Sequence, residues 1–220
     1  MKKLLFLGMF FLTLSLTSCF ELVEQISMNE DGTGEMTVTL NLNESKEQLK
    51  EFMQSEDGAG GFAAPDQKEL DAFFKNIVAT VNDVEGISNV KSDIFYEDFI
   101  FSISGSFERV EAMNEAVSKF TTGMTRGMLD LKNEYAYEKG TFKRSFQSPI
   151  PEGEYEKVPM MQRVILESAR IISVYRFEKE IKRMSNDDTE LSFDKKEARF
   201  ESTLGDVVKG IRSPDNVINL

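Results

Sequence analysis

Apolar and polar positions recur along the chain with two different periods. In residues 34–43 nearly every second residue is apolar, and this period of two predicts a half-buried strand. In residues 66–82 the apolar residues are spaced by three and four, which places them in one stripe along a helix. Both patterns return several times, so the chain combines strands with amphipathic helices.

The remaining pattern predicts further elements of both kinds. Strands are expected at 20–28, 34–43, 88–96, 99–107, 134–147 (one strand or a hairpin turning at 139–140), 171–177, 189–193 and 198–204, and helices at 44–55, 66–82, 108–120, 160–169 and 204–210. Tight turns join neighbouring strands, which is typical of antiparallel pairing. The predicted fold is therefore α+β, an antiparallel β-sheet with amphipathic helices packed on one face.

The acidic turn at 29–34 has two interpretations. Its composition, Asn29 to Gly34 with Asp31 and Gly32 inside, is typical of a hairpin turn. A calcium-binding loop is the alternative, but the EF-hand spacing places its glycine at the sixth position, and Gly32 comes too early. We therefore expect a plain hairpin.

The first eighteen residues have the features of a secretory signal. Lys2 and Lys3 precede an apolar run from Leu4 to Leu16, and small residues follow. The run is shorter than the roughly 20 residues that a membrane-spanning helix needs. Residues 1–18 are thus expected to be removed as a signal peptide.

The end of this segment resembles the lipobox of bacterial lipoproteins, which signal peptidase II cleaves. The four residues are Leu16, Thr17, Ser18 and Cys19, and Cys19 is the only cysteine in the chain. The resemblance implies a diacylglyceryl group on the Cys19 sulfur, with acyl chains such as palmitate, and cleavage before that residue. An ordinary signal peptide with an incidental cysteine is the alternative. Two or more acyl chains make a stable anchor, so the predicted partner of Cys19 is a membrane.

The residue after Cys19 bears on location. Phe20 opens an apolar segment with no flexible linker, so the folded body is expected close to the bilayer. Phe20 is also not the aspartate that retains enteric lipoproteins at the inner membrane. The expected location is the cell envelope, with the protein lipid-anchored at the outer membrane if the organism is Gram-negative.

The mature chain is expected to form one domain. Residues 19–212 make up the α+β envelope domain, and residues 213–220 form a polar, frayed C-terminal tail. With its Asp31-Gly32 hairpin and its late Ser185-Asn186 turn, the body resembles uncharacterised lipoproteins with an LppM-type domain. That resemblance implies an envelope protein with a binding or scaffolding role.

Composition excludes several kinds of chemistry. The chain has no histidine, so catalytic triads and imidazole ligands are absent, and with one cysteine a zinc site is excluded too. A net charge of −12 argues against nucleic acid as a partner. No residue pattern predicts a cofactor or a metal.

Two patterns raise the question of catalysis. Ser88 to Lys91 matches the S-x-x-K motif of penicillin-binding proteins, but it falls in a predicted strand, and the companion S-D-N and K-T-G motifs are missing. The 38 acidic residues leave a carboxylate-dependent hydrolase as a less favoured alternative. We expect that the protein is not an enzyme.

Two functional hypotheses remain for the domain. The first is a non-catalytic binding or structural role through an envelope protein partner. The second is a carrier of a small hydrophobic or lipid ligand at the membrane surface, since the 18 Phe and 11 Met of the chain could line a cavity between sheet and helices. An exposed apolar patch would favour the first hypothesis and a cavity the second.

Overall fold

The structure is a computed structural model that describes residues 20–46, 67–125, 132–148, 150–151 and 153–220. It has α+β architecture with two β-sheets, and the predicted fold class is confirmed. The signal segment, Cys19 and most of the predicted helix at 44–55 lie outside the described residues.

The larger sheet has seven strands in the order β3-β4-β2-β1-β7-β10-β9. Its strands are β1 (Phe20–Met28), β2 (Gly34–Asn41), β3 (Ile87–Phe95), β4 (Ile100–Phe107), β7 (Ala169–Phe177), β9 (Thr189–Leu191) and β10 (Glu197–Thr203). All neighbours are antiparallel except β1 and β7, which run parallel. The prediction of antiparallel pairing therefore holds for the hairpins, while the pairing between strands far apart in sequence adds one parallel contact.

A smaller antiparallel sheet has the order β5-β6-β11-β8 and was not predicted. Its strands are β5 (Lys132–Glu138), β6 (Thr141–Gln147), β8 (Arg183–Met184) and β11 (Asn216–Asn219). The helices are α2 (Gln67–Asn82), α3 (Val110–Thr125), α4 (Met160–Ser168) and α5 (Leu204–Val208), with short 3₁₀ turns η1 (Asn43–Ser45) and η2 (Tyr155–Lys157). The β5–β6 hairpin turns at Lys139 and Gly140, both with positive φ, as a two-residue hairpin loop requires.

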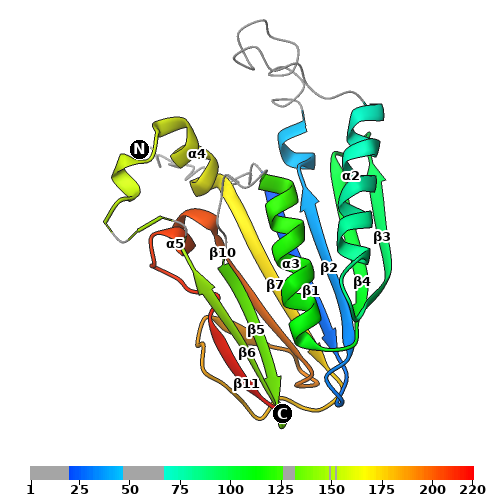
Figure 1. Ribbon diagram of the computed structural model, residues 1–220. Coiled ribbons are helices and arrows are strands. Elements are labelled where there is room, and N and C mark those ends of the chain that lie inside the picture. The colour runs from blue at the N-terminus through cyan, green and yellow to red at the C-terminus, as the bar shows by residue number, and fades with distance from the viewer. Residues whose placement is uncertain (1–19, 47–66, 126–131, 149, 152) are drawn as a thin grey trace, which may run out of the picture.

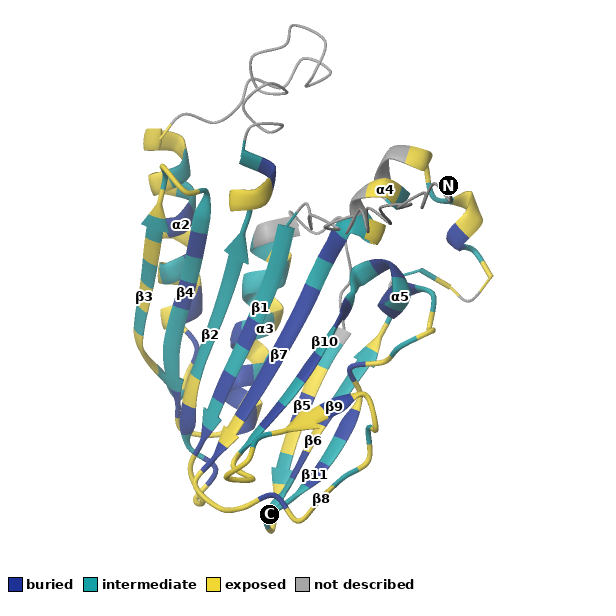
Figure 2. Cartoon of the chain, turned by 180° about the vertical axis from the view of Figure 1, so that it is seen from behind, coloured by how far each residue is buried: buried dark blue, intermediate teal, exposed yellow. Residues whose placement is uncertain are grey.

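Helices α2 and α3 and the smaller sheet cover the same face of the larger sheet (Figure 1). The helices pack over β2 and β4, and the smaller sheet packs over β1, β7 and β10. Figure 2 shows the sheet from behind, with β3, β4, β2 and β1 mostly half-buried or exposed and β7 largely buried. Ion pairs such as Arg170 with Glu21 and Arg176 with Glu197 lie on that outer face, and β7 between them is buried.

The acidic turn at 29–34 closes the β1–β2 hairpin, as predicted. The Asp31 carboxylate accepts hydrogen bonds from the backbone nitrogen and the hydroxyl of Thr33, at 3.0 and 2.7 Å. These two bonds lower the pKa of Asp31. The side chain of Asp31 is therefore engaged in shaping the turn.

The prediction that residues 213–220 form a frayed tail is wrong. Asn216–Asn219 form β11, which pairs with β6 on one side and β8 on the other, and Ile218 is completely buried. Four residues with two asparagines carry little strand signal of their own. Both partner strands come from distant parts of the sequence, and their pairing supplies what local propensity lacks.

Candidate functional site

An apolar cavity lies between the larger sheet and the two helices α2 and α3. It has a main part of about 200 Å³ and a smaller part of about 50 Å³. Both parts are lined by the same five residues, Met36 and Val38 of β2, Ile103 of β4, and Val117 and Phe120 of α3. The two parts are therefore neighbouring sections of one apolar space.

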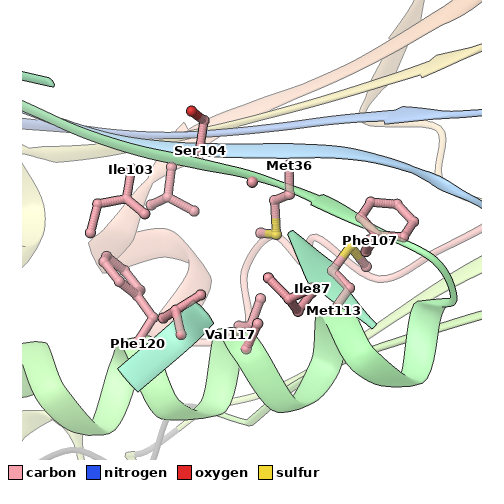
Figure 3. A pocket seen from close by; sticks show the side chains of 12 residues that line it. Met36, Ile87, Ile103, Ser104, Phe107, Met113, Val117 and Phe120 are labelled. Carbon is pink, nitrogen blue, oxygen red and sulfur yellow. The ribbon is translucent and has the colours of Figure 1, made fainter. Parts of the chain in front are cut away.

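The periodicity of the sequence explains why these side chains face one another. Met36 and Val38 are two residues apart and share the inner face of β2. Met113, Val117 and Phe120 follow at spacings of four and three, so they share one face of α3. Figure 3 shows the α3 side chains pointing toward Met36 and Ile103 across the gap.

Helix α2 contributes an aromatic wall. Phe74 stacks on Phe101 of β4 with ring centroids 5.3 Å apart and an interplanar angle of 6°. Phe73 meets Phe74 edge to face at 5.5 Å. Each such aromatic pair contributes about 0.5–1.5 kcal/mol of stability beyond the burial of its surface. The α2 side of the cavity is therefore held in place by these contacts.

The main part of the cavity extends to the end of the sheet where β1 begins. Phe20 and Leu22, the first and third residues of β1, are part of its lining. Cys19, the one residue that the sequence singled out, precedes Phe20 directly but lies outside the described residues. The structure therefore does not show Cys19 with any partner.

A polar cluster borders the cavity at Glu24 and Asn133. The Glu24 carboxylate accepts hydrogen bonds from the hydroxyls of Tyr135 and Tyr175, at 2.7 and 3.0 Å. The Arg144 guanidinium lies 3.3 Å from the same carboxylate. Arg144 is itself completely buried and donates to Ser173, Tyr175 and Asn133.

Burial determines how these groups titrate. It raises the pKa of Tyr135, and the Glu24 charge raises it further. Burial also raises the pKa of Tyr175, although Arg144 opposes this effect. Burial alone would lower the pKa of Arg144, but Glu24 and the two tyrosines outweigh it and the pKa rises. At neutral pH the hydroxyls therefore stay protonated and donate to Glu24, and Arg144 stays charged.

The cluster consequently forms a polar border of the cavity that hydrogen bonds and an ion pair hold in place. The Glu24 carboxylate accepts two hydrogen bonds from tyrosine hydroxyls, and its ion pair with Arg144 balances its charge. Apolar walls with a few converging polar groups are typical of small-molecule sites.

The sequence did not reveal this cluster. Glu24 stands at an inward position of β1, between Leu22 and Ile26, and Arg144 stands between Phe142 and Phe146 of β6. A charged residue inside an apolar alternation is a signal that could have been noticed. Its partner could not, because the two strands are far apart in sequence.

A second, charged cavity of about 860 Å³ lies among η2, α4, α5, β7 and β10. Its cations are held by carboxylates, such as Arg170 by Glu21 and Lys209 by Glu167. The Tyr155 hydroxyl donates to Glu167 at 2.8 Å, and burial followed by this bond raises the pKa of Tyr155 to about 12. The cavity is thus lined by internal ion pairs of both signs.

The S-x-x-K match lies on β3, an edge strand of the larger sheet. Ser88 and Lys91 are both exposed, and the β3–β4 register shifts between them. Within the residues that the structure describes, no group of three or more Asp, Glu, Cys or His residues could hold a metal ion. In the same part of the chain, no helix is long and apolar enough to cross a membrane.

Comparison with known proteins does not assign the chain to a family. No model of a protein family matches the chain, and none of the curated proteins matches it either. Among solved structures, the chain is similar to the NMR structure of the folded domain of the LppM protein of Mycobacterium tuberculosis. That similarity has 8% identity, a TM-score of 0.45, and coverage of 92% of this chain and 90% of that one. A similarity at this level carries no inference about function.

Proposed function

We propose that this chain is a lipid-anchored protein of the bacterial cell envelope that binds a hydrophobic ligand without catalysing a reaction. The observation that carries the proposal is the apolar cavity between the larger sheet and helices α2 and α3. A cavity favours the carrier hypothesis over a purely structural role.

The size and lining of the cavity indicate the kind of ligand. An engineered apolar cavity of about 150 Å³ in another protein stays dry and binds benzene, so the main part here, about 200 Å³, has room for an apolar group. Each buried CH₂ group contributes about 0.8 kcal/mol. A narrow alkyl chain with one polar group near Glu24 and Asn133 fits this lining best.

The lipobox-like segment supports the anchor. Acylation of Cys19 would tether a body that begins at the next residue, and the acyl chains would be its contact with the membrane. The outer membrane is the proposed location in a Gram-negative organism. The test is metabolic labelling with a palmitate analogue, in which Cys19→Ala should lose both the label and the membrane fraction, while Ser18→Ala keeps both.

The absence of histidine from the sequence and the state of Glu24 support a role without catalysis. The Glu24 carboxylate at the cavity accepts hydrogen bonds from two tyrosine hydroxyls and pairs with the Arg144 guanidinium, which supports a structural role for this carboxylate.

Native mass spectrometry of the chain from Phe20 to Leu220, purified without detergent, tests ligand binding. That chain contains every described element. The expected result is a lipid-sized mass that disappears on denaturation. An empty chain would contradict the carrier function and favour a protein partner, for which the exposed Leu191 and Phe193 are the first place to crosslink.

A matched pair of variants makes the test specific to this cavity. Val117→Phe places a larger side chain into both parts of the cavity and should reduce the bound lipid. Leu191→Phe places an aromatic ring on the exposed edge strand β9, away from both parts of the cavity, and should leave the bound lipid unchanged. Equal binding by both variants would place the ligand elsewhere.

A further inference from the structure

Helix α4 lies at the end of the larger sheet where β1 begins. Its last residue, Ser168, is followed directly by Ala169, and Ala169 pairs with Phe20 in the parallel β1–β7 ladder. Cys19 is one peptide bond from Phe20, so their Cα atoms are about 3.8 Å apart. Acyl chains on Cys19 would therefore bring the bilayer to this end of the molecule.

Helix α4 exposes apolar side chains at this end. Met160 is 74% exposed and Val164 is 53% exposed, and their spacing of four places them on one face of the helix. Lys157 and Arg163 are close in sequence and form ion pairs with Glu154 and Glu156. Met160 and Val164 also border the open charged cavity, on the same face as Arg163 and Glu167. Exposed apolar side chains beside a long cationic one are found in helices that lie in a membrane interface.

We propose that α4 rests on the bilayer that carries the lipid anchor, with Met160 and Val164 inserted to the level where the headgroups meet the acyl chains. This inference rests on the proposed acylation of Cys19. It adds an orientation, in which the end of the cavity lined by Phe20 faces the membrane and a lipid ligand enters from the bilayer.

The short connection to the anchor identifies the bilayer as the occupant of this surface. A flexible linker would let the domain turn freely, but here none of the chain separates Cys19 from β1. Tethering turns a weak contact into an intramolecular one with a high effective concentration. Two exposed apolar side chains are then enough to bias the orientation, although they would not bind a membrane alone.

Tryptophan fluorescence tests this contact cleanly because the chain has no tryptophan. The full-length lipoprotein carrying Met160→Trp is reconstituted in phosphatidylcholine vesicles with brominated acyl chains, which quench an indole that reaches them. Val164→Trp is the second probe. Phe193→Trp is the matched control, because Phe193 is fully exposed and follows β9 at the opposite end of the sheet, roughly eight strand steps or 26 Å from Phe20.

The expected result is loss of emission for the probes at 160 and 164 and unchanged emission for the probe at 193, each relative to unbrominated vesicles. Unquenched probes on α4 in protein whose intact mass shows the acyl chains would overturn the inference. The same mass measurement shows separately whether Cys19 is acylated, so failure of the anchor is distinguishable from failure of the α4 contact.

Discussion

One face of the larger sheet is covered in two different ways, and the two halves differ in how well they are filled. Under the smaller sheet, Phe142 and Ile218 are completely buried, and even the Arg144 guanidinium has no contact with solvent. Under α2 and α3, apolar side chains leave a cavity of about 200 Å³ in its main part. The same strands thus support a dense half and a half with space.

The cause is the shape of the covering layer. Two stacked sheets have the same twist and lie about 10 Å apart, so the side chains of their inner faces interdigitate. Phe142 there contacts Tyr135, Tyr175 and Phe177 within about 6 Å, ring centre to ring centre. Two helices are cylinders on a twisted surface, so space remains unless large side chains fill it. In this half Val38 and Val117 stand at the gap and do not fill it.

This difference suggests that one half stabilises the fold and the other half can bind a ligand. The dense half holds the fold, and its buried pair of Glu24 and Arg144 is held by side chains of β5 and β7, one strand from each sheet. The helix-covered half can accept a guest because its packing is incomplete. Glu24 lies at the boundary and belongs to both halves.

The largest effect is expected from breaking the buried pair. Arg144→Met leaves Glu24 buried without its cation, which costs about 3–5 kcal/mol of unfolding free energy. Lys157→Met removes an exposed ion pair and should cost about 0–1 kcal/mol. Urea denaturation measures both. Similar losses for the two variants would contradict a structural role for the dense half.

Two phenylalanines compare the halves directly. Phe142→Ala should cost about 3–5 kcal/mol, because a fully buried ring leaves a cavity that the tight surroundings cannot close. Phe120→Ala, at the existing cavity, should cost clearly less, since this ring is only partly buried. The denaturation midpoints of the two variants measure which substitution destabilises the protein more. A larger loss at Phe120 would reverse the comparison.

Alkaline pH should weaken the dense half. The raised pKa values of Tyr135 and Tyr175 mean that the folded chain keeps two protons above about pH 10, where the unfolded chain loses them. Stability is therefore complete below about pH 10 and falls as the pH rises, by about 1.4 kcal/mol per pH unit for each retained proton. Unfolding free energy measured across this range gives the slope. Tyr135→Phe removes one retained proton and should lower the slope by about 1.4 kcal/mol per pH unit, and an unchanged slope would contradict the assignment.

The smallest expected change in stability comes from enlarging one side chain in each half, which distinguishes a half with free space from a closely packed one. Val117→Phe should stabilise the empty protein by about 0.5–2 kcal/mol, because the added ring occupies the cavity. Ala198→Val in the dense half should instead cost about 1–3 kcal/mol, because Ala198 is completely buried in close packing. Thermal unfolding should show shifts of opposite sign. Destabilisation by both variants would mean that the helix-covered half has no usable space.

The elements that the sequence predicted well are those with local signals. Helix α2 was expected at 66–82 and spans Gln67–Asn82, and the hairpins at 29–34 and 139–140 form where the turn residues stand. Strand β11 was missed because Asn216–Asn219 owe their conformation to β6 and β8. The sequence shows the apolar stripes of α2 and α3. It does not show whether these helices pack tightly on the sheet or leave a cavity.

The sequence by itself determined the period of each element, the turns, the lack of imidazole chemistry and the lipobox-like segment ending at Cys19, because all of these depend on neighbours in the chain. Only the tertiary structure decided that β1 pairs in parallel with β7, that Glu24 meets Arg144, and that the helices leave a cavity. These features depend on contacts between residues more than a hundred positions apart or on the fit of whole layers. Local periodicity contains no information about either.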